Sequence, residues 1–309
     1  MLPLDKDDDG HGCRFFSLKD KTALAPRSFT ETFSDRRCVG SSHGWLVLLD
    51  EDSEPYLLDP LRGGRGPPPP SRQDVLLCAP NFGRVGVWME LTGHSGPYSD
   101  VTFHEGMLFA LCNSGFVETW DFNRDHPLKI MEIKSSFPRK SAEAAHAFRN
   151  VCFTSTYSIE AAGEILLLVR FTANFVNKHG VPIEEDYLPT EEDIHPLVYP
   201  YRTLYFHVYV LDINSEEWVG LDSIGDWAVF VGGSHSRSVL AREFPEFEAN
   251  SVYFTDDNWD PGERHDSYSG HDMGVYSLQR RKVREICELG SDKIKPPPLW
   301  VFPSDYRSN

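Results

Sequence analysis

The residues that come nearest to a metal-binding pattern are Asp256, Asn258 and Asp260, which occupy alternate positions as the first ligands of an EF-hand calcium loop do. The sixth position of such a loop needs glycine for a sharp turn, and here it is Pro261. The twelfth position needs a glutamate that binds calcium through both oxygens, and here it is Ser267. The pattern therefore favours a polar turn over a calcium site.

Histidine and serine patterns give no stronger sign of catalysis. His265 and His271 flank an acidic loop, but no cysteine or third histidine lies near them, so the pair matches no zinc spacing. The G-x-S-x-G match at 40–44 leads into a strand instead of a helix, which indicates a turn and not a nucleophile. His207 alternates with apolar neighbours and is expected on the solvent-facing side of a strand.

Glycine-rich segments do not supply a phosphate site either. The run at 63–66 lacks the lysine and the following helix of a phosphate-binding loop. We therefore predict no catalytic, cofactor-binding or metal-binding residue. One alternative stays open, because a site assembled only in space, for example in the channel of a closed fold, leaves no mark in sequence spacing.

Charge limits the kinds of partner. The chain has 30 basic and 47 acidic residues, a net charge of −17, which disfavours nucleic acid and anionic membranes. Glu184–Asp193 carries six carboxylates in ten residues, which predicts a solvated loop or, alternatively, a surface for a basic partner. Arg280, Arg281, Lys282 and Arg284 predict a basic hairpin whose charges discourage edge pairing.

Cysteines and the N-terminus bear on the compartment. The six cysteines have wide, irregular spacings and form no C-x-x-C, so they are expected to be small core residues in a reducing compartment. The first ten residues lack the features of a signal peptide, and the longest aliphatic run, Ile165–Val169, is too short to span a bilayer. We expect a cytoplasmic or nuclear protein.

Short apolar runs separated by turn residues recur along the chain and predict an all-β fold. A single short helix is expected, at Ser141–Arg149. The expected strands are Arg14–Leu18, Gly44–Asp50, Pro55–Asp59, Val75–Cys78, Val85–Leu91, Ser99–Phe103, Met107–Cys112, Phe116–Phe122, Leu128–Ile133, Thr156–Glu160, Glu164–Phe171, Leu204–Asp212, Glu217–Leu221, Ala228–Gly232, Ser251–Phe254, Met273–Leu278 and Val283–Glu288.

A recurring unit organises these strands. In each unit an apolar strand ends in an aspartate, and a polar turn and a second strand follow it. The aspartate side chain is expected to cap the turn by hydrogen bonding to the local backbone. The aspartates are Asp59, Asp121 and Asp212, and Gln279 takes the place in the last unit. The intervals exceed the ~40–50 residues of one propeller blade, so some blades must be degenerate or carry long loops. We predict a β-propeller of about six four-stranded blades, with five or seven as alternatives.

Such a ring must close, because an open sheet edge invites pairing with other chains. Leu299–Pro303 is apolar and follows three prolines. It is expected to pair beside an N-terminal strand, either Arg14–Leu18 or Gly44–Asp50, so that deleting residues 296–309 collapses the domain. The expected organisation is a mobile acidic tail at 1–12, the propeller at 13–305 and a tail at 306–309.

Several segments carry a resemblance to a known family over about residues 13–305. They are CVGSSHGWLVLLD, YLLDPLRG, YSDVTFHEGMLFALCNSGFVETWDF, GEILLLVR, VYVLDINSEEWVGLDSIGDWAVFVGG, NSVYFTDDN and PPPLWVFPS. In this order they resemble the plant F-box-associated β-propeller family, the KIB-type or "kink suppressed" domain, some members of which are described as kelch-like. The kelch repeat itself is not present here, because its double glycine occurs after one apolar strand only, at 232–233.

The resemblance implies a function. Family members usually carry an F-box that docks on the Skp-type adaptor of a cullin ubiquitin ligase, while the propeller captures the protein to be ubiquitinated. The resemblance supplies no catalytic residues. No F-box precedes the propeller in this sequence, so either the sequence is a truncated or incomplete gene product, or the chain is a member that lacks direct docking on the adaptor. The chain then resembles a substrate receptor without its F-box, or a degenerate copy without activity.

Loops are where a propeller binds its partners. The long loops expected here are Gly63–Asp74, Thr172–Tyr201 and Asn258–His271. Tyr187, Trp259 and Tyr268 are the candidate partner-binding residues, because aromatic side chains on such loops often anchor protein interfaces. Partly buried loop aromatics without a binding role are the alternative.

Overall fold

In the part of the chain that the structure describes, the protein folds into successive β-sheets with one short α-helix. The computed structural model describes residues 2–4, 14–20, 22–24, 37–42, 45–50, 52, 54–58, 65, 76–78, 88–91, 93, 95–123, 126–177, 179–184, 198–233, 236–257, 271–286 and 298–302. Within these residues six sheets follow the order of the chain, each built from consecutive strands.

The first three sheets are small. Their strands are β1 (Leu2–Leu4), β2 (Arg14–Ser17) and β3 (Thr22–Leu24), then β4 (Arg37–Ser42), β5 (Trp45–Leu49) and β6 (Pro55–Leu58), then β7 (Leu76–Cys78) and β8 (Trp88–Glu90). All neighbours in these sheets pair antiparallel.

The next two sheets are four-stranded antiparallel meanders. The fourth sheet contains β9 (Tyr98–His104), β10 (Met107–Cys112), β11 (Val117–Asp121) and β12 (Leu128–Ile133). Helix α1 (Arg139–Ala147) leads to the fifth sheet, with β13 (Cys152–Ala161), β14 (Glu164–Asn177), β15 (Val198–Asp212) and β16 (Glu217–Leu221). The expected helix is thus confirmed, two residues earlier than its predicted bounds.

The sixth sheet departs from a simple meander. Its strands are β17 (Trp227–Val231), β18 (Arg237–Leu240), β19 (Ser251–Phe254), β20 (Gly274–Ser277) and β21 (Lys282–Arg284), and the 3-10 helix η2 (Ala241–Glu243) follows β18. Their spatial order is β18-β17-β19-β20-β21, with β17 and β19 parallel. The expectation of four strands in every blade is therefore wrong for this sheet. The basic strand β21 lies at its edge, as predicted.

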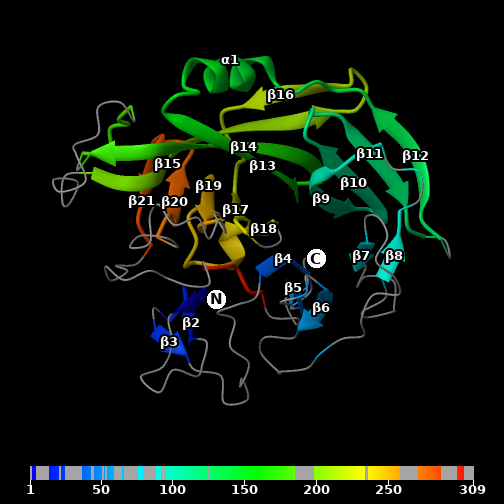
Figure 1. Ribbon diagram of the computed structural model, residues 1–309, viewed down its shortest axis with the longest axis horizontal. Coiled ribbons are helices and arrows are strands. Elements are labelled where there is room, and N and C mark those ends of the chain that lie inside the picture. The colour runs from blue at the N-terminus through cyan, green and yellow to red at the C-terminus, as the bar shows by residue number, and fades with distance from the viewer. Residues whose placement is uncertain are drawn as a thin grey trace.

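The fifth sheet has two apolar faces, and the fourth and sixth sheets cover them. Ile165, Leu167 and Val169 of β14 pack with residues of β10 and β11, whereas Leu166 and Leu168 pack with residues of β17 and β19. This alternation follows from the period of two in a strand. Figure 1 shows the sheets following one another around the molecule, β9–β12 at the right, β13–β16 at the top and β17–β21 at the left. The fold is a β-propeller, as predicted.

Aspartate-closed turns are confirmed where the structure describes them. The Asp121 carboxylate accepts a hydrogen bond from the Asn123 amide at 2.8 Å, and that of Asp212 accepts one from the Asn214 amide at 2.9 Å. Asp59 lies outside the described residues. The recurring unit therefore corresponds to the outer hairpins of neighbouring sheets, such as β11–β12 and β15–β16.

Two expectations about the chain ends need correction. Leu2–Leu4 lie in the segment expected to be a mobile tail, yet they form β1 and pair with β2. Leu299–Phe302 form no strand, so the predicted closing strand is wrong for these described residues. Instead Leu299, Trp300 and Val301 are buried by side-chain packing, and Leu18 joins the cluster that contains Trp300.

The long loop expected at Thr172–Tyr201 is also corrected. Strand β14 continues to Asn177 and β15 begins at Val198, and the two extensions pair with each other. Burial of Ala173 and Val176 explains why the strand does not end at Phe171, because both side chains need a packed face.

Candidate functional site

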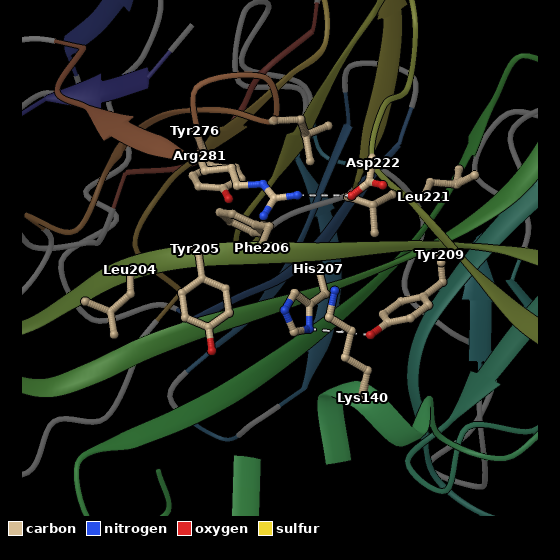
Figure 2. Close-up of a pocket in the computed structure, with 13 residues that line it drawn as sticks. Lys140, Leu204, Tyr205, Phe206, His207, Tyr209, Leu221, Asp222, Tyr276 and Arg281 are labelled. Carbon is tan, nitrogen blue, oxygen red and sulfur yellow. Dashed lines mark hydrogen bonds and ion pairs between the residues drawn. The ribbon is translucent and has the colours of Figure 1, made fainter. Parts of the chain in front are cut away.

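A pocket opens on β15, near the end of β16, with a volume of about 440 Å³. Figure 2 shows the side chains of Tyr205, His207 and Tyr209 on one face of β15, as the period of two requires. This volume lies within the range of about 300–1,000 Å³ that small-ligand sites occupy. His207 is half-buried in the wall of this pocket, so its predicted place on an open solvent-facing side needs correction.

Helix α1 fixes the His207 side of the pocket. The Ser141 hydroxyl, which is 0% exposed, lies 2.8 Å from His207 Nδ1 and 2.7 Å from the Tyr209 hydroxyl. Burial lowers the pKa of His207 to about 4, with a further contribution from the positive charges of Lys140 and Arg281. His207 is therefore neutral at physiological pH.

This serine–histidine pair does not have the properties of a hydrolytic centre. A catalytic serine must be open to its substrate, whereas Ser141 is fully buried. The pair instead connects α1 to β15 by hydrogen bonds.

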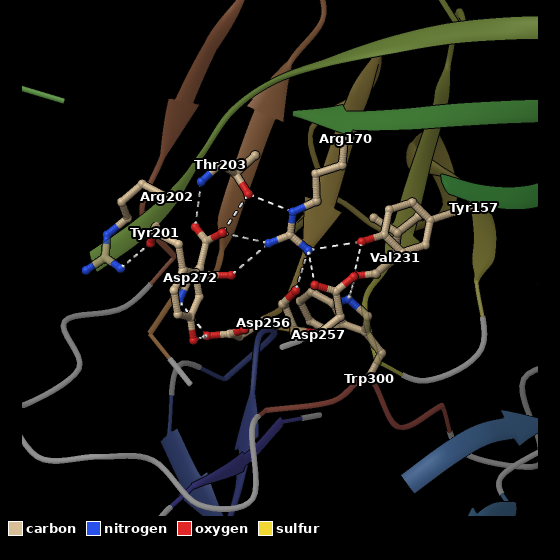
Figure 3. A network of polar contacts seen from close by, with 11 residues as sticks. Tyr157, Arg170, Tyr201, Arg202, Thr203, Val231, Asp256, Asp257, Asp272 and Trp300 are labelled. Atoms are coloured by element: carbon tan, nitrogen blue, oxygen red, sulfur yellow. Dashed lines mark hydrogen bonds and ion pairs between the residues drawn. The ribbon is translucent and has the colours of Figure 1, made fainter. Parts of the chain in front are cut away.

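A second constellation surrounds Arg170, on the opposite face of β14 from Val169 and Phe171. The guanidinium is 1% exposed and donates to Thr203 Oγ1 at 2.7 Å and to the Thr255 carbonyl oxygen at 2.9 Å. It also donates to the Asp272 carboxylate at 2.9 Å (Figure 3).

Acidic and aromatic neighbours keep this buried cation charged. Burial alone would lower the pKa of Arg170, but Tyr157, Asp257 and Asp272 outweigh it and hold that pKa well above its usual value. Asp257 lies 3.3 Å from the guanidinium, and the Phe254 ring lies beneath it at 4.8 Å from its centroid. Each donor of the guanidinium therefore has a partner, as a buried charge requires.

Arg170 and its partners, Tyr157, Thr203, Asp257 and Asp272, are hereafter called the Arg170 network. Asp257 directly precedes residues 258–270, and Asp272 follows them after one residue. Asp256, next to Asp257, accepts from the Tyr201 hydroxyl at 2.7 Å and from the Asp272 amide at 3.3 Å. The two ends of the segment 258–270 are thus tied to each other and to β14 and β15.

The three candidate partner-binding residues are not placed by the structure. Tyr187, Trp259 and Tyr268 lie outside the described residues. So do Asn258 and Asp260 of the calcium-like pattern, whose first residue, Asp256, is hydrogen-bonded within the protein. Arg170 and Asp272 were not among the residues predicted from the sequence. A single arginine in the apolar run EILLLVRFTA was a signal for a buried, paired cation.

One further polar side chain, that of Asp100, connects strands of different sheets. The Asp100 carboxylate of β9 accepts from the Ser158 amide of β13 at 2.8 Å and from the Ser236 hydroxyl, which directly precedes β18, at 3.2 Å. In Figure 1 these strands belong to three neighbouring sheets. Within the described part of the chain no group of three or more His, Cys, Asp or Glu could hold a metal ion.

Two further properties can be stated for the described residues. Cys112 and Cys152 are buried, free thiols, in agreement with the core role expected of the cysteines. No helix there is both long and apolar enough to cross a bilayer.

Comparisons with known proteins find matches over most of the chain. A family model described as KIB1-4 β-propeller matches residues 15–85 and 69–277. F-box protein SKIP23 of Arabidopsis thaliana is 26% identical over 240 residues, which are 74% of this chain and 53% of that protein. F-box protein At4g35733 of the same plant is 28% identical over 162 residues, 52% of this chain and 38% of that protein. The chain thus spans about half the length, or less, of these relatives.

Proposed function

The chain belongs to the KIB1-4 β-propeller family, and from this membership we propose that it is a non-enzymatic propeller whose loops capture a partner protein. Its relatives are named F-box proteins, which supports a role in substrate recognition for a ubiquitin ligase of the SCF type. Such a role would be carried out in the cytoplasm or nucleus.

The Arg170 network is the observation that carries this proposal. A buried cation with a full set of partners is costly to assemble and tolerates little displacement. Here it holds both ends of the segment 258–270, between Asp257 and Asp272. A rigid base under a loop lowers the entropy that binding must overcome. A segment whose two flanking residues are held in this way suits recognition of another protein.

The aromatic residues of these loops are the proposed anchors. Trp259 and Tyr268 belong to the segment held by the Arg170 network, and Tyr187 belongs to the segment between β14 and β15. Tyrosine and tryptophan dominate the energetic centres of protein interfaces because they bury a large area at a small cost in side-chain entropy. We propose that these three residues contact the partner.

The test is a proximity-labelling experiment in Arabidopsis protoplasts with two matched variants of the full chain. Trp259→Ser/Tyr268→Ser removes the proposed anchors, whereas Asp266→Ser/Ser269→Ala alters polar residues of the same segment. We expect partners labelled by the wild type to be retained by the second variant and lost, at least about tenfold, from the first, which corresponds to about 1.4 kcal/mol or more. Thermal unfolding must be equal for both. Retention of every partner by the Trp259/Tyr268 variant and by a Tyr187→Ser variant would contradict the proposal.

A further inference from the structure

Strand β15 is only partly covered on its outer edge. It runs from Val198 to Asp212 and pairs with β14 along most of this length. Strand β16 pairs only with Val208–Asp212. Among the described residues, no strand therefore pairs with residues 204–207 on the β16 side. That stretch lines the pocket.

Leu204 adds an irregularity at this edge. Phe171 pairs with Tyr205 and Thr172 pairs with Thr203, so Leu204 is an extra residue with no partner in β14. Such a bulge leaves the backbone groups of one residue outside the ladder and is common beside functional sites.

The walls of the pocket suit alternating side chains. The partly buried Leu204 and the buried Phe206, Tyr276 and Leu278 line the pocket beside the open edge. On the other face of β15, Tyr205 stacks on Phe171 with ring centroids 4.6 Å apart, and the neutral His207 ring lies next to it. An extended chain lying along this edge would direct its side chains alternately to these two faces.

Charge distinguishes this pocket from the rest of the chain. Lys140 and Arg281 line it, although the whole chain has a net charge of −17. Arg281 pairs with Asp222 at 3.2 Å, both of them exposed. Arg280 and Lys282 flank Arg281, and together with Lys140 they form no ion pair with any described residue. Asp222 also lines the pocket, so the charged lining residues Lys140, Arg281 and Asp222 together carry one excess positive charge, which favours an acidic ligand.

We propose that this pocket binds an extended acidic segment of the partner protein, which adds to the edge of β15 in the position that a longer β16 would take. The main-chain hydrogen bonds of such strand addition supply affinity, and the pockets for alternate side chains supply specificity. The proposal rests on the proposed function, since the occupant is part of the captured protein, but it uses a surface other than the segment 258–270.

The experiment uses the full chain and a panel of fluorescent hexapeptides in which glutamate alternates with valine, leucine, phenylalanine or tyrosine. Binding is measured by fluorescence anisotropy. We expect at least one peptide to bind and its lysine-for-glutamate version to bind at least about tenfold more weakly. N-methylation of one set of alternate amides should abolish binding, and N-methylation of the other set should leave it within about twofold, because only one set faces β15.

Protein variants locate the site. Arg281→Glu should weaken the best peptide at least about tenfold, whereas Arg284→Glu, on the same hairpin but outside the pocket lining, should change it by less than about threefold. Absence of binding by the whole panel, or equal loss from both N-methylation patterns, overturns the proposal.

These measurements are separate from the partner-capture test. If partners depend on Trp259 and Tyr268 but not on Arg281, the pocket proposal fails and the proposed function stands. If no variant alters partner capture, the proposed function fails, and the peptide measurements still decide whether the pocket accepts a strand.

Discussion

At the residue scale, Asp100 shows how burial and hydrogen bonding compete in this fold. Its carboxylate accepts from the amides of Val101 and Ser158, both at 2.8 Å, which favours the charged form. Burial has the larger effect and raises the pKa of Asp100 from its usual 3.8 to about 6. The ionised carboxylate is therefore less favourable in the folded protein than in the unfolded chain.

The sign of the resulting pH dependence follows from linkage. Because the folded protein holds this proton more tightly, Asp100 reduces stability as the pH rises from about 4 to above 6. We expect Asp100→Asn to gain up to about 3 kcal/mol in unfolding free energy relative to the wild type over this range, at ~1.4 kcal/mol per pKa unit. Urea unfolding between pH 4 and pH 7.5 measures it, with the exposed Asp226→Asn as the control. A difference between Asp100→Asn and wild type that is constant with pH would refute the assignment.

At the element scale, local patterns predicted the outer hairpins well and the long hairpin poorly. Aspartate turns at Asp121 and Asp212 depend on neighbouring residues only, so their sequence signal is complete. The extension of β14 to Asn177 depends on pairing with β15, which the mixed residues TANFVN do not reveal. The parallel pairing of β17 with β19 is likewise set by distant contacts.

The same difference between local signals and contacts of distant residues applies to the candidate site. Tyr187, Trp259 and Tyr268, which were chosen from local loop composition, lie outside the described residues and stay predictions. The sequence did not identify the Arg170 network, because Arg170 and Asp272 are 102 residues apart and meet only in the fold. The open edge of β15 was equally hidden, since it depends on where β16 ends and not on β15 itself.

The Arg170 network should control the stability of β14, β15 and the segment 258–270 together. Arg170→Met leaves Asp272, which is 3% exposed, without its cation, and we expect a loss of about 3–5 kcal/mol in unfolding free energy. Arg170→Met/Asp272→Asn should recover part of that loss, because the unpaired charge is gone. Limited proteolysis should cut 258–270 faster in Arg170→Met.

The exposed Arg139→Met serves as the control and should not change stability measurably. Equal stability of Arg170→Met and wild type would show that the network is not a structural base.

At the scale of the whole molecule, the C-terminal segment contributes packing and not a strand. Trp300 is 1% exposed, and its ring meets that of Phe230 edge-on with centroids 5.1 Å apart. Its indole N–H donates to the Val231 carbonyl oxygen at 2.9 Å. Leu18, just after β2, packs on the same cluster. Segments near both ends of the described chain therefore pack against the sixth sheet.

This packing of the C-terminal segment predicts a graded series of losses in unfolding free energy when the segment is changed. Trp300→Ala leaves a cavity against Phe230 and should cost about 3–5 kcal/mol of unfolding free energy. Trp300→Phe keeps much of the apolar contact and loses the hydrogen bond to Val231, so about 1–3 kcal/mol is expected. A chain ending before residue 298 also loses Leu299 and Val301, both buried, and should be at least as unstable as Trp300→Ala. Chemical unfolding followed by tryptophan fluorescence and circular dichroism measures the series. If the shortened chain unfolds cooperatively with wild-type stability, the sixth sheet does not need this segment, and the packing argument is wrong.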